Sequence, residues 1–196
     1  MPLKDYSVRD KYTYPDSPVL INRKNIRDGE RLEQFESEAV YLRSAQLLLR
    51  PIAGRFDIHH LKAVHHYLFQ DVYAWADELR TVNISKGSST FGFWQYIEQH
   101  LTSELERISR EQFLAGLQRA QLVQRLTYFL SEINAAHPFR EGNGRAQREF
   151  IRELALRAGH KVNWSTVNRD ALYTASADSM KGNLAPLAEI IDLAMD

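Results

Sequence analysis

The stretch RAQLVQRLTYFLSEINAAHPFREGNGRAQR, residues 119–148, decides the fold of this chain more than any other part. Its first half places apolar side chains at helical spacing. They form one continuous stripe: Leu122, Val123, Leu126, Phe129, Leu130 and Ile133. Pro138 lacks a backbone N–H, so this helix is predicted to end at about His137. The glycines of Gly142-Asn143-Gly144 permit a sharp turn, and a second helix is predicted over 144–158.

Helical periodicity extends over most of the remaining chain. Further helices are predicted over about 30–49, 57–70, 94–113, 168–181 and 184–194. In the first of these, the apolar residues that recur at helical spacing are Phe35, Ala39, Leu42, Ala45 and Leu49. Asp57 is predicted to be the N-cap of the second. Residues 1–29 predict an irregular arm, with Tyr12 and Tyr14 as packing anchors.

The helical period fails between Glu78 and Phe93. Residues 80–84 alternate polar and apolar side chains like a strand, residues 86–89 have the composition of a turn, and residues 90–93 can form a second strand. The predicted fold class is therefore all-α (mainly α), with one short β-hairpin. Residues 1–54 are expected to be an arm and first helix packed on one globular unit, residues 55–196.

Composition excludes several classes of function. The chain has 196 residues and no cysteine, so disulfide frameworks, thiolate nucleophiles and cysteine-based zinc sites are excluded. Lys plus Arg and Asp plus Glu both total 25, which favours neither a general nucleic-acid binder nor a membrane-surface binder. The first residues lack the apolar region of a secretory signal, and no apolar run approaches a membrane span. A cytoplasmic enzyme or regulator, with no nucleic-acid or membrane partner, is expected.

The turn at residues 142–144 has the features of an anion site. Successive N–H groups in a glycine turn form an anion nest, and a helix N-terminus adds partial positive charge. Arg145 and Arg148 lie one helical turn apart, so both can face this end. Two guanidinium groups beside a nest suit a polyphosphate better than a single carboxylate.

Glu141 and His137 add reactive groups to this site. A carboxylate beside phosphates would be repelled unless a cation lies between them, so Glu141 is a candidate Mg²⁺ ligand. His137 is the candidate general base for a hydroxyl nucleophile, although a helix C-terminus favours the protonated imidazole. Phe139 is expected to point into the core. Each feature alone is more often structural, but their joint occurrence within twelve residues favours phosphate chemistry.

These residues resemble a known family. Residues 137–148, HPFREGNGRAQR, meet every fixed position of the long and specific motif HxFx(D/E)GNGRxxR of the Fic family. Residues 54–57, 72–76 and 80–87 look like the upstream half of a Fic domain, and the arm at 12–22 is similar to small bacterial Fic proteins. The resemblance implies a helical Fic fold with a hairpin flap. It also implies transfer of AMP from ATP to a Ser, Thr or Tyr hydroxyl of a target protein.

The family's residue roles carry over by position. The resemblance implies that His137 deprotonates the target hydroxyl, Glu141 holds Mg²⁺, and the two arginines bind the departing pyrophosphate end. The residues implied in ATP binding are Ser85, Lys86, Gly87, Arg140, Gly142, Asn143, Gly144, Arg145 and Arg148. The hairpin at 82–93 resembles the flap that docks the target chain as an extra strand. Its implied docking residues are Gly87, Ser88, Ser89, Thr90 and Phe91.

Three details refine the resemblance. Phosphorylating relatives carry a lysine where this chain has Gly144, so AMP transfer is favoured over kinase action. No (S/T)xxxE(G/N) inhibitory helix is found in either terminal region, which resembles the class inhibited in trans by a small antitoxin whose glutamate pairs with Arg148. In that class DNA gyrase and topoisomerase IV are implied targets. Asp77 stands where the family usually has glycine, and Asp tolerates a positive φ better than most residues.

Rival functions remain open. The same nest and base could remove AMP or transfer another phosphate-linked group. A non-catalytic ATP-binding module is also possible in principle, but the intact His137 argues against it. A metal hydrolase is a weaker alternative, because the histidines at 59–60 and 65–66 fall on mixed faces of a helix and core or surface roles are favoured.

Overall fold

The computed structural model describes residues 10–86 and 89–196 of the chain. The α-helices are α1 (Gly29–Leu49), α2 (Ile58–Phe69), α3 (Trp94–Arg110), α4 (Arg119–Ala136), α5 (Asn143–Arg157), α6 (Arg169–Ser179) and α7 (Ala185–Ala194). Short 3₁₀ turns, η1 (Gln112–Leu114) and η2 (Trp164–Thr166), lie between helices. Two short strands, β1 (Ser85–Lys86) and β2 (Ser89–Thr90), pair antiparallel. The predicted mainly α fold with one hairpin is confirmed.

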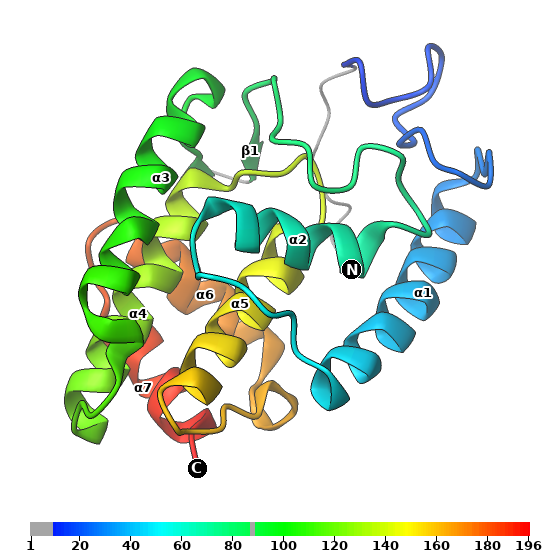
Figure 1. Ribbon diagram of the computed structural model, residues 1–196. Helices are drawn as coiled ribbons and strands as arrows, with labels where there is room; N and C mark the ends of the chain where they lie inside the picture. Colours follow the sequence, from blue (N-terminus) through cyan, green and yellow to red (C-terminus); the bar gives the residue numbers. More distant parts are fainter. Residues whose placement is uncertain (1–9, 87–88) are drawn as a thin grey trace.

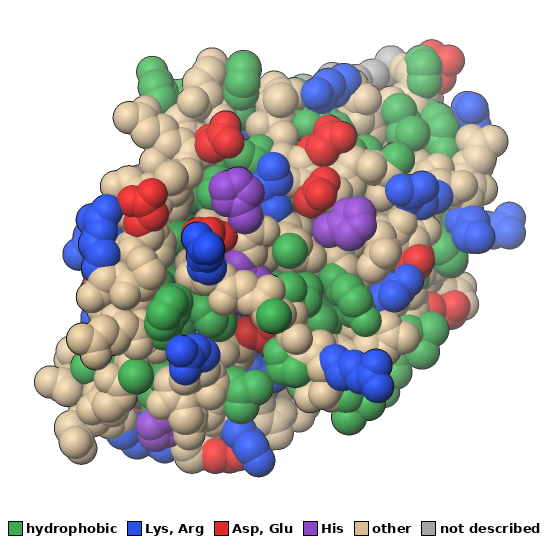
Figure 2. Space-filling view, viewed as in Figure 1, with side chains coloured by type: hydrophobic (Ala, Val, Ile, Leu, Met, Phe, Trp, Pro, Cys, Tyr) green, Lys and Arg blue, Asp and Glu red, His purple; other side chains and the backbone are tan. Residues whose placement is uncertain are grey.

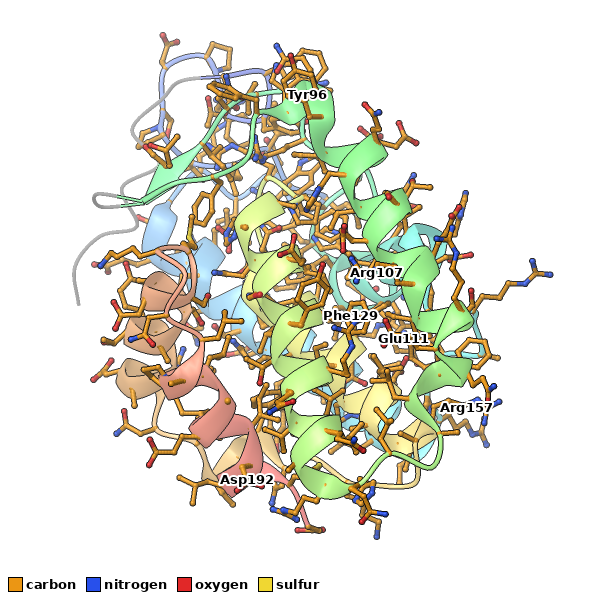
Figure 3. All side chains as sticks on the ribbon, turned by 90° about the vertical axis from the view of Figure 1, so that its left-hand side faces the viewer. Tyr96, Arg107, Glu111, Phe129, Arg157 and Asp192 are labelled. Carbon is orange, nitrogen blue, oxygen red and sulfur yellow. The ribbon has the colours of Figure 1, made fainter. Side chains whose placement is uncertain are left out.

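Helices α4 and α5 form the centre of the bundle. Helix α5 packs against α4 on one side and α2 on the other, while α3, α6 and α7 surround α4 (Figure 1). All six residues of the predicted α4 stripe are buried, as are Phe150, Ile151 and Leu154 of α5. Figure 3 shows α3 and α4 running side by side, with the hairpin near the end of α3 that carries Tyr96. The sequence pattern therefore located the central helices and their inward faces correctly.

Helix α2 is also as predicted. Asp57 caps it, because its carboxylate accepts a hydrogen bond of 2.9 Å from the His60 N–H. Tyr12 and Tyr14 of the arm are buried, as predicted from the sequence. Figure 2 shows charged side chains of both signs interspersed on one face of the molecule, as the balanced composition suggests. Among the described residues, no helix is long and apolar enough to cross a lipid bilayer.

The predicted apolar face of α1 is not the buried face. The buried residues of α1 are Leu32, Glu36, Val40 and Leu47. Leu42 and Leu49, two residues of the predicted set, are 64% and 84% exposed. The reason is that α1 carries apolar residues on several sides, so periodicity alone did not select one of them. The buried side is decided by contacts with distant parts of the fold. Glu36, for example, bonds to Tyr73 and to Arg145.

The hairpin is shorter than predicted and is shifted along the chain. Residues 80–84 were expected to pair as a strand with residues 90–93, but β1 and β2 lie at 85–86 and 89–90. The backbone groups at the base of the hairpin pair with the end of α4 and the loop after it. The Arg80 N–H donates to Pro138 O at 2.9 Å, and the Gly92 N–H donates to Ala135 O at 2.9 Å. Such groups are not available to extend a two-stranded ladder.

Helix α3 ends earlier than the predicted boundary at Phe113. Its last residue is Arg110, and the chain then takes three consecutive positive φ angles at Gln112, Phe113 and Leu114. A right-handed helix cannot include that conformation. Leu114, the last residue of this turn, is buried. Its left-handed backbone could not be predicted from its apolar side chain.

The corrected face of α1 can be tested with one substitution at two sites. Leu47 is fully buried, so Leu47→Ala is expected to lower the free energy of unfolding by about 2–5 kcal/mol. The matched control, Leu42→Ala, changes an exposed leucine of the same helix and should have an effect within about 0.5 kcal/mol. Urea unfolding measures both. Equal losses in the two variants would contradict the observed orientation of α1.

Candidate active site

His137 lies at the C-terminal end of α4. It is the C-cap residue, with a left-handed backbone (φ 46°, ψ 62°), and it is buried. Its Nδ1 lies 3.3 Å from the carbonyl oxygen of Asn134. A carbonyl can only accept, so Nδ1 carries the proton, and in the neutral imidazole Nε2 then has the lone pair. This is the nitrogen that could take a proton from a substrate.

Phe91 fixes the plane of the His137 ring. The two rings are stacked, with centroids 3.7 Å apart and planes 15° apart, and Phe91 is buried. The resemblance implied that Phe91 helps to dock a target on the hairpin. The structure places this side chain inward against the imidazole, so its role in docking stays a prediction. No sequence pattern indicated the stacking contact.

The loop between α4 and α5 is braced by its own asparagine. The Asn143 side chain accepts from the Phe139 N–H at 2.8 Å and donates to the Phe139 carbonyl at 2.7 Å. Both of its polar groups are thus used within the loop. Phe139 itself is fully buried, as predicted from the sequence. The Asn143 side chain therefore shapes the loop, and a contact with a ligand would come through its backbone N–H.

Gly142 is required where the loop enters α5. It has φ 81°, and a Cβ atom at this position would lie 2.2 Å from Cζ of Phe69. Helix α5 begins at the next residue, and the first N–H groups of an α-helix have no acceptors within the helix. The N–H groups of Asn143 and Gly144 are thus available to an anion. At Gly144 a Cβ would lie 3.2 Å from Nη1 of Arg148, so any larger residue here would require this guanidinium to shift.

Arg145 is surrounded by carboxylates. Its Nη2 lies 2.5 Å from Oε1 of Glu36 on α1 and 3.3 Å from Oε1 of Glu141. Burial opposes the charged form, but Glu36 and Glu141 outweigh it and raise the pKa of Arg145. The Tyr73 hydroxyl also donates to Glu36. Burial, and next the negative charge of Glu36, raise the pKa of Tyr73 well above its usual value. Arg145 thereby ties α1 to the loop, and its charge is compensated within the protein.

Arg148 differs from Arg145 in its surroundings. Among the described residues no carboxylate pairs with it, and the charged groups that act on it are the like charges of Arg145 and Arg169. Burial, and then those two arginines, lower the pKa of Arg148 to about 10. It still carries its charge at neutral pH. An uncompensated, half-buried cation near a helix N-terminus is a strong attractor for an anion.

Glu141 and Arg140 occupy different environments. Glu141 is buried, and its Oε1 accepts from the Gly142 N–H at 2.9 Å. Arg140 is 2% exposed, and its Nε donates to Oδ2 of Asp10 at 2.8 Å, which holds the arm on the loop. Binding of ATP by Arg140, implied by the resemblance, stays a prediction, and its buried ion pair favours a structural contribution. Within the described part of the chain, no three His, Asp or Glu side chains form a ready-made metal site.

The hairpin residues implied in binding lie on two short strands. Ser85 and Lys86 form β1, and Ser89 and Thr90 form β2. Ser85 and Thr90 are exposed. Gly87 and Ser88 lie outside the described residues, so predictions for them stay as stated.

Sequence reasoning missed the role of His65. Its Nδ1 accepts from the Asp77 N–H at 3.0 Å, so its Nε2 carries the proton and donates to the Glu141 carbonyl at 3.0 Å. The ring is stacked on Phe139, with centroids 3.8 Å apart. Asp77 has φ 82°, the conformation for which glycine is usual. The one departure from the family pattern is thus joined through His65 to the loop.

Comparisons with known proteins show the family to which this chain is related. The Fic/DOC family model matches residues 55–155. The chain belongs to the Fic/DOC family. It is 38% identical over 182 residues to the probable protein adenylyltransferase Fic of Escherichia coli K12, and the match covers 93% of this chain and 90% of that protein.

Another relative and two solved structures extend the comparison. The chain is 42% identical over 182 residues to the protein adenylyltransferase VbhT of Bartonella schoenbuchensis; the match covers 93% of this chain but 38% of VbhT. The N-terminal Fic domain of a Bartonella quintana protein, solved with bound ADP, has a TM-score of 0.89 at 25% identity, with 94% of each chain covered. BepC of Bartonella tribocorum, solved with AMPPNP, has a TM-score of 0.87 at 24% identity over 94% of this chain and 96% of that one, which supports the fold.

The buried state of His65 predicts a pH effect on stability. Burial lowers the pKa of His65 to about 3, from 6.5, so the folded protein resists protonation that the unfolded chain accepts. This stabilisation is complete above the pKa that His65 has in the unfolded chain, 6.5. It is lost as the pH falls from there towards about 3, the pKa in the folded protein. From pH 7 to pH 5 this one group should remove about 2 kcal/mol from the free energy of unfolding.

The measurement is urea unfolding at both pH values. In His65→Gln the loss between pH 7 and pH 5 should be smaller than in wild type by about that amount. His59 lies on the same helix with its side chain 85% exposed, and His59→Gln should keep the wild-type loss. A wild-type pH dependence in His65→Gln would refute the assignment.

Proposed function

We propose that this chain is a protein adenylyltransferase that moves AMP from ATP to a Ser, Thr or Tyr hydroxyl of a target protein. The observation that carries the proposal is the pairing of an oriented imidazole with an anion site on one short loop. His137 has Nδ1 bonded to Asn134, and α5 begins at Asn143 after residues 138–142. The relative that is 38% identical over 93% of the chain is named a probable protein adenylyltransferase, and the one that is 42% identical is named a protein adenylyltransferase.

The proposed reaction begins with proton transfer to His137. Nε2 takes the proton of the target hydroxyl as its oxygen attacks the α-phosphorus of ATP. A bond forms between that oxygen and the α-phosphorus, and the bond from the α-phosphorus to the oxygen that bridges to the β-phosphorus breaks. Pyrophosphate leaves. Such a transfer depends on alignment and on stabilising the phosphate charge, so the protein need supply only position and cations.

The α5 N-terminus and Arg148 are the proposed phosphate contacts. The N–H groups of Asn143 and Gly144 belong to the first turn of α5, and Arg148 has no carboxylate partner in the described structure. Arg145 adds positive charge, but Glu36 and Glu141 already balance it. The family resemblance alone supports nucleotide contacts by four further residues, which are Ser85, Lys86, Gly87 and Arg140.

Mg²⁺ fits this site only together with the nucleotide. The donor set is one buried carboxylate, Glu141, and Mg²⁺ is commonly held by one or two carboxylates plus substrate phosphates. Glu141 would therefore hold the ion against the phosphates. The bound ion would neutralise charge that develops on them.

The hairpin is the proposed docking edge for the target chain. Its two strands form a sheet of two, so each has an outer edge that can pair with an extended peptide. We further propose that the protein is a cytoplasmic toxin inhibited by a small antitoxin. The absence of a carboxylate on Arg148 in the described residues supports a glutamate supplied in trans. DNA gyrase and topoisomerase IV are the proposed targets.

The reaction type can be tested with labelled ATP. With purified gyrase or topoisomerase IV as the candidate target, label should enter it from ATP labelled at the α-phosphate and not at the γ-phosphate. His137→Ala should lose transfer by a factor of at least about 10², the scale of general-base catalysis. Label that enters only from the γ-position would overturn AMP transfer in favour of kinase chemistry. Equal toxicity of His137→Ala and wild type on expression would instead support a binding module.

The proposed phosphate contact of Arg148 can be tested in a binding experiment. Arg148→Ala is expected to weaken ATP binding about 10- to 100-fold, the value of one charge-assisted contact. Its melting temperature should not fall, because the variant also removes repulsion from Arg145 and Arg169. Calorimetric titration with Mg²⁺ and ATP, and a thermal melt, give both results. The control, Arg157→Ala, changes an arginine at the far end of α5 and should leave ATP affinity intact.

A further inference from the structure

Within the described part of the chain, Arg80 is a fully buried arginine whose side-chain hydrogen bonds all go to main-chain carbonyls. It is 1% exposed. Nε donates to His137 O at 2.8 Å, and Nη2 donates to Ala136 O at 3.0 Å. Nη2 also donates to Gly92 O, and Nη1 to Val82 O, both at 2.5 Å. One planar group therefore contacts four carbonyls from two separate segments.

The charge of Arg80 is stabilised by a helix end. No acidic side chain of the described residues pairs with it. Burial lowers the pKa of Arg80 to about 10, which keeps it cationic at neutral pH. A buried charge without a counter-ion is costly unless other groups solvate it. The end of α4 does so, because its last carbonyls lack helical donors and carry the negative end of the helix dipole.

The four carbonyls divide into two groups with different functions. Ala136 and His137 belong to the segment that carries the imidazole. Val82 and Gly92 flank the hairpin, β1 and β2, one on each side. The guanidinium thus ties both ends of the hairpin to the backbone of His137. Phe91, next to Gly92, stacks on the same imidazole and completes the connection.

We propose that Arg80 is a positioning residue for AMP transfer, which holds the hairpin edge at a fixed distance from the His137 imidazole. The proposal rests on the proposed function, because the hairpin is the edge on which the target hydroxyl would be presented. Loss of Arg80 would also leave four main-chain carbonyls without this donor, so the test has to separate positioning from stability. The fork geometry is what spans the two segments.

Lysine cannot reproduce this arrangement. Its ammonium is a single point with three donors, whereas the Arg80 donors are spread over a rigid plane. Arg80→Lys keeps a cation at the end of α4 but cannot reach both that end and the hairpin. The proposed nucleotide contacts, Arg148 and the α5 N-terminus, are not bonded to Arg80. The hairpin and the imidazole should therefore separate while the phosphate contacts of Arg148 and the α5 N-terminus are kept.

The experiment compares Arg80→Lys with Arg152→Lys. Arg152 is a buried arginine of α5 that bonds to Glu149 and to the Leu47 carbonyl, so its loss tests general damage to the core. In the full chain, hydrogen exchange is measured for the amides at 82–92, and Mg²⁺–ATP affinity by calorimetry. Arg80→Met joins the series to test an apolar residue of similar length. The labelled target then gives kcat and the target KM.

The expected result separates these quantities. In Arg80→Lys the hairpin amides should exchange at least about tenfold faster, the effect of losing one charge-assisted hydrogen bond. The ratio kcat/KM for the target should fall about 100-fold, as for a misplacement of about 1 Å. ATP affinity should fall far less, because the phosphate contacts of Arg148 and the α5 N-terminus are kept. Arg80→Met should behave like Arg80→Lys. Arg152→Lys should lower the melting temperature without either effect.

Two outcomes would overturn the proposal. One is hairpin exchange in Arg80→Lys that matches Arg152→Lys. The other is faster exchange with wild-type kcat and KM. The exchange experiment uses neither a target nor AMP transfer, so it also distinguishes the two proposals. If wild type transfers no AMP, the proposed function fails, and exchange alone still decides whether Arg80 holds the hairpin on His137.

Discussion

The last carbonyls of α4 need partners inside the protein, and the partners that they find set the geometry around them. An α-helix leaves its final carbonyls without helical donors. At residues 134–137 these carbonyls accept from an imidazole, from the Gly92 N–H and from the guanidinium of Arg80. The imidazole orientation, the hairpin position and the loop after α4 therefore follow from satisfying one helix end.

A second constraint is the distribution of charge over the loop. Two arginines of the motif stand one turn apart, yet only one has its charge balanced. Arg145 is held by Glu36 and Glu141, whereas Arg148 faces other arginines and no carboxylate of the described residues. One cation thus secures helix α1 to the site, and the other remains for an anionic ligand. The same residue type serves structure at one position and, in the proposed function, binding at the next turn.

The central fold followed from local physics. The apolar stripe of α4 and the cap of α2 were readable because each depends on side chains close in sequence. Helix α1 was different, since it is apolar on several sides and its buried face was chosen by Arg145 and Tyr73 from distant segments. The hairpin was predicted but misplaced, because its expected backbone partners were taken by the end of α4. The sequence pattern reveals the periodicity of an element. Contacts with distant segments decide which face of a helix is buried and which residues of a hairpin pair.

The sequence by itself determined the chemistry that the site has available: an imidazole at a helix end, a glycine turn, a carboxylate and two guanidinium groups. Those residues lie within one segment, so their types and order already restrict what they can bind. Only the tertiary structure decided how they are held. Arg80 bonds to the His137 carbonyl 57 residues away, Phe91 stacks on the same residue, and His65 bonds to the Glu141 carbonyl 76 residues away. Contacts of that kind depend on how helices pack, and no local pattern of residues encodes them.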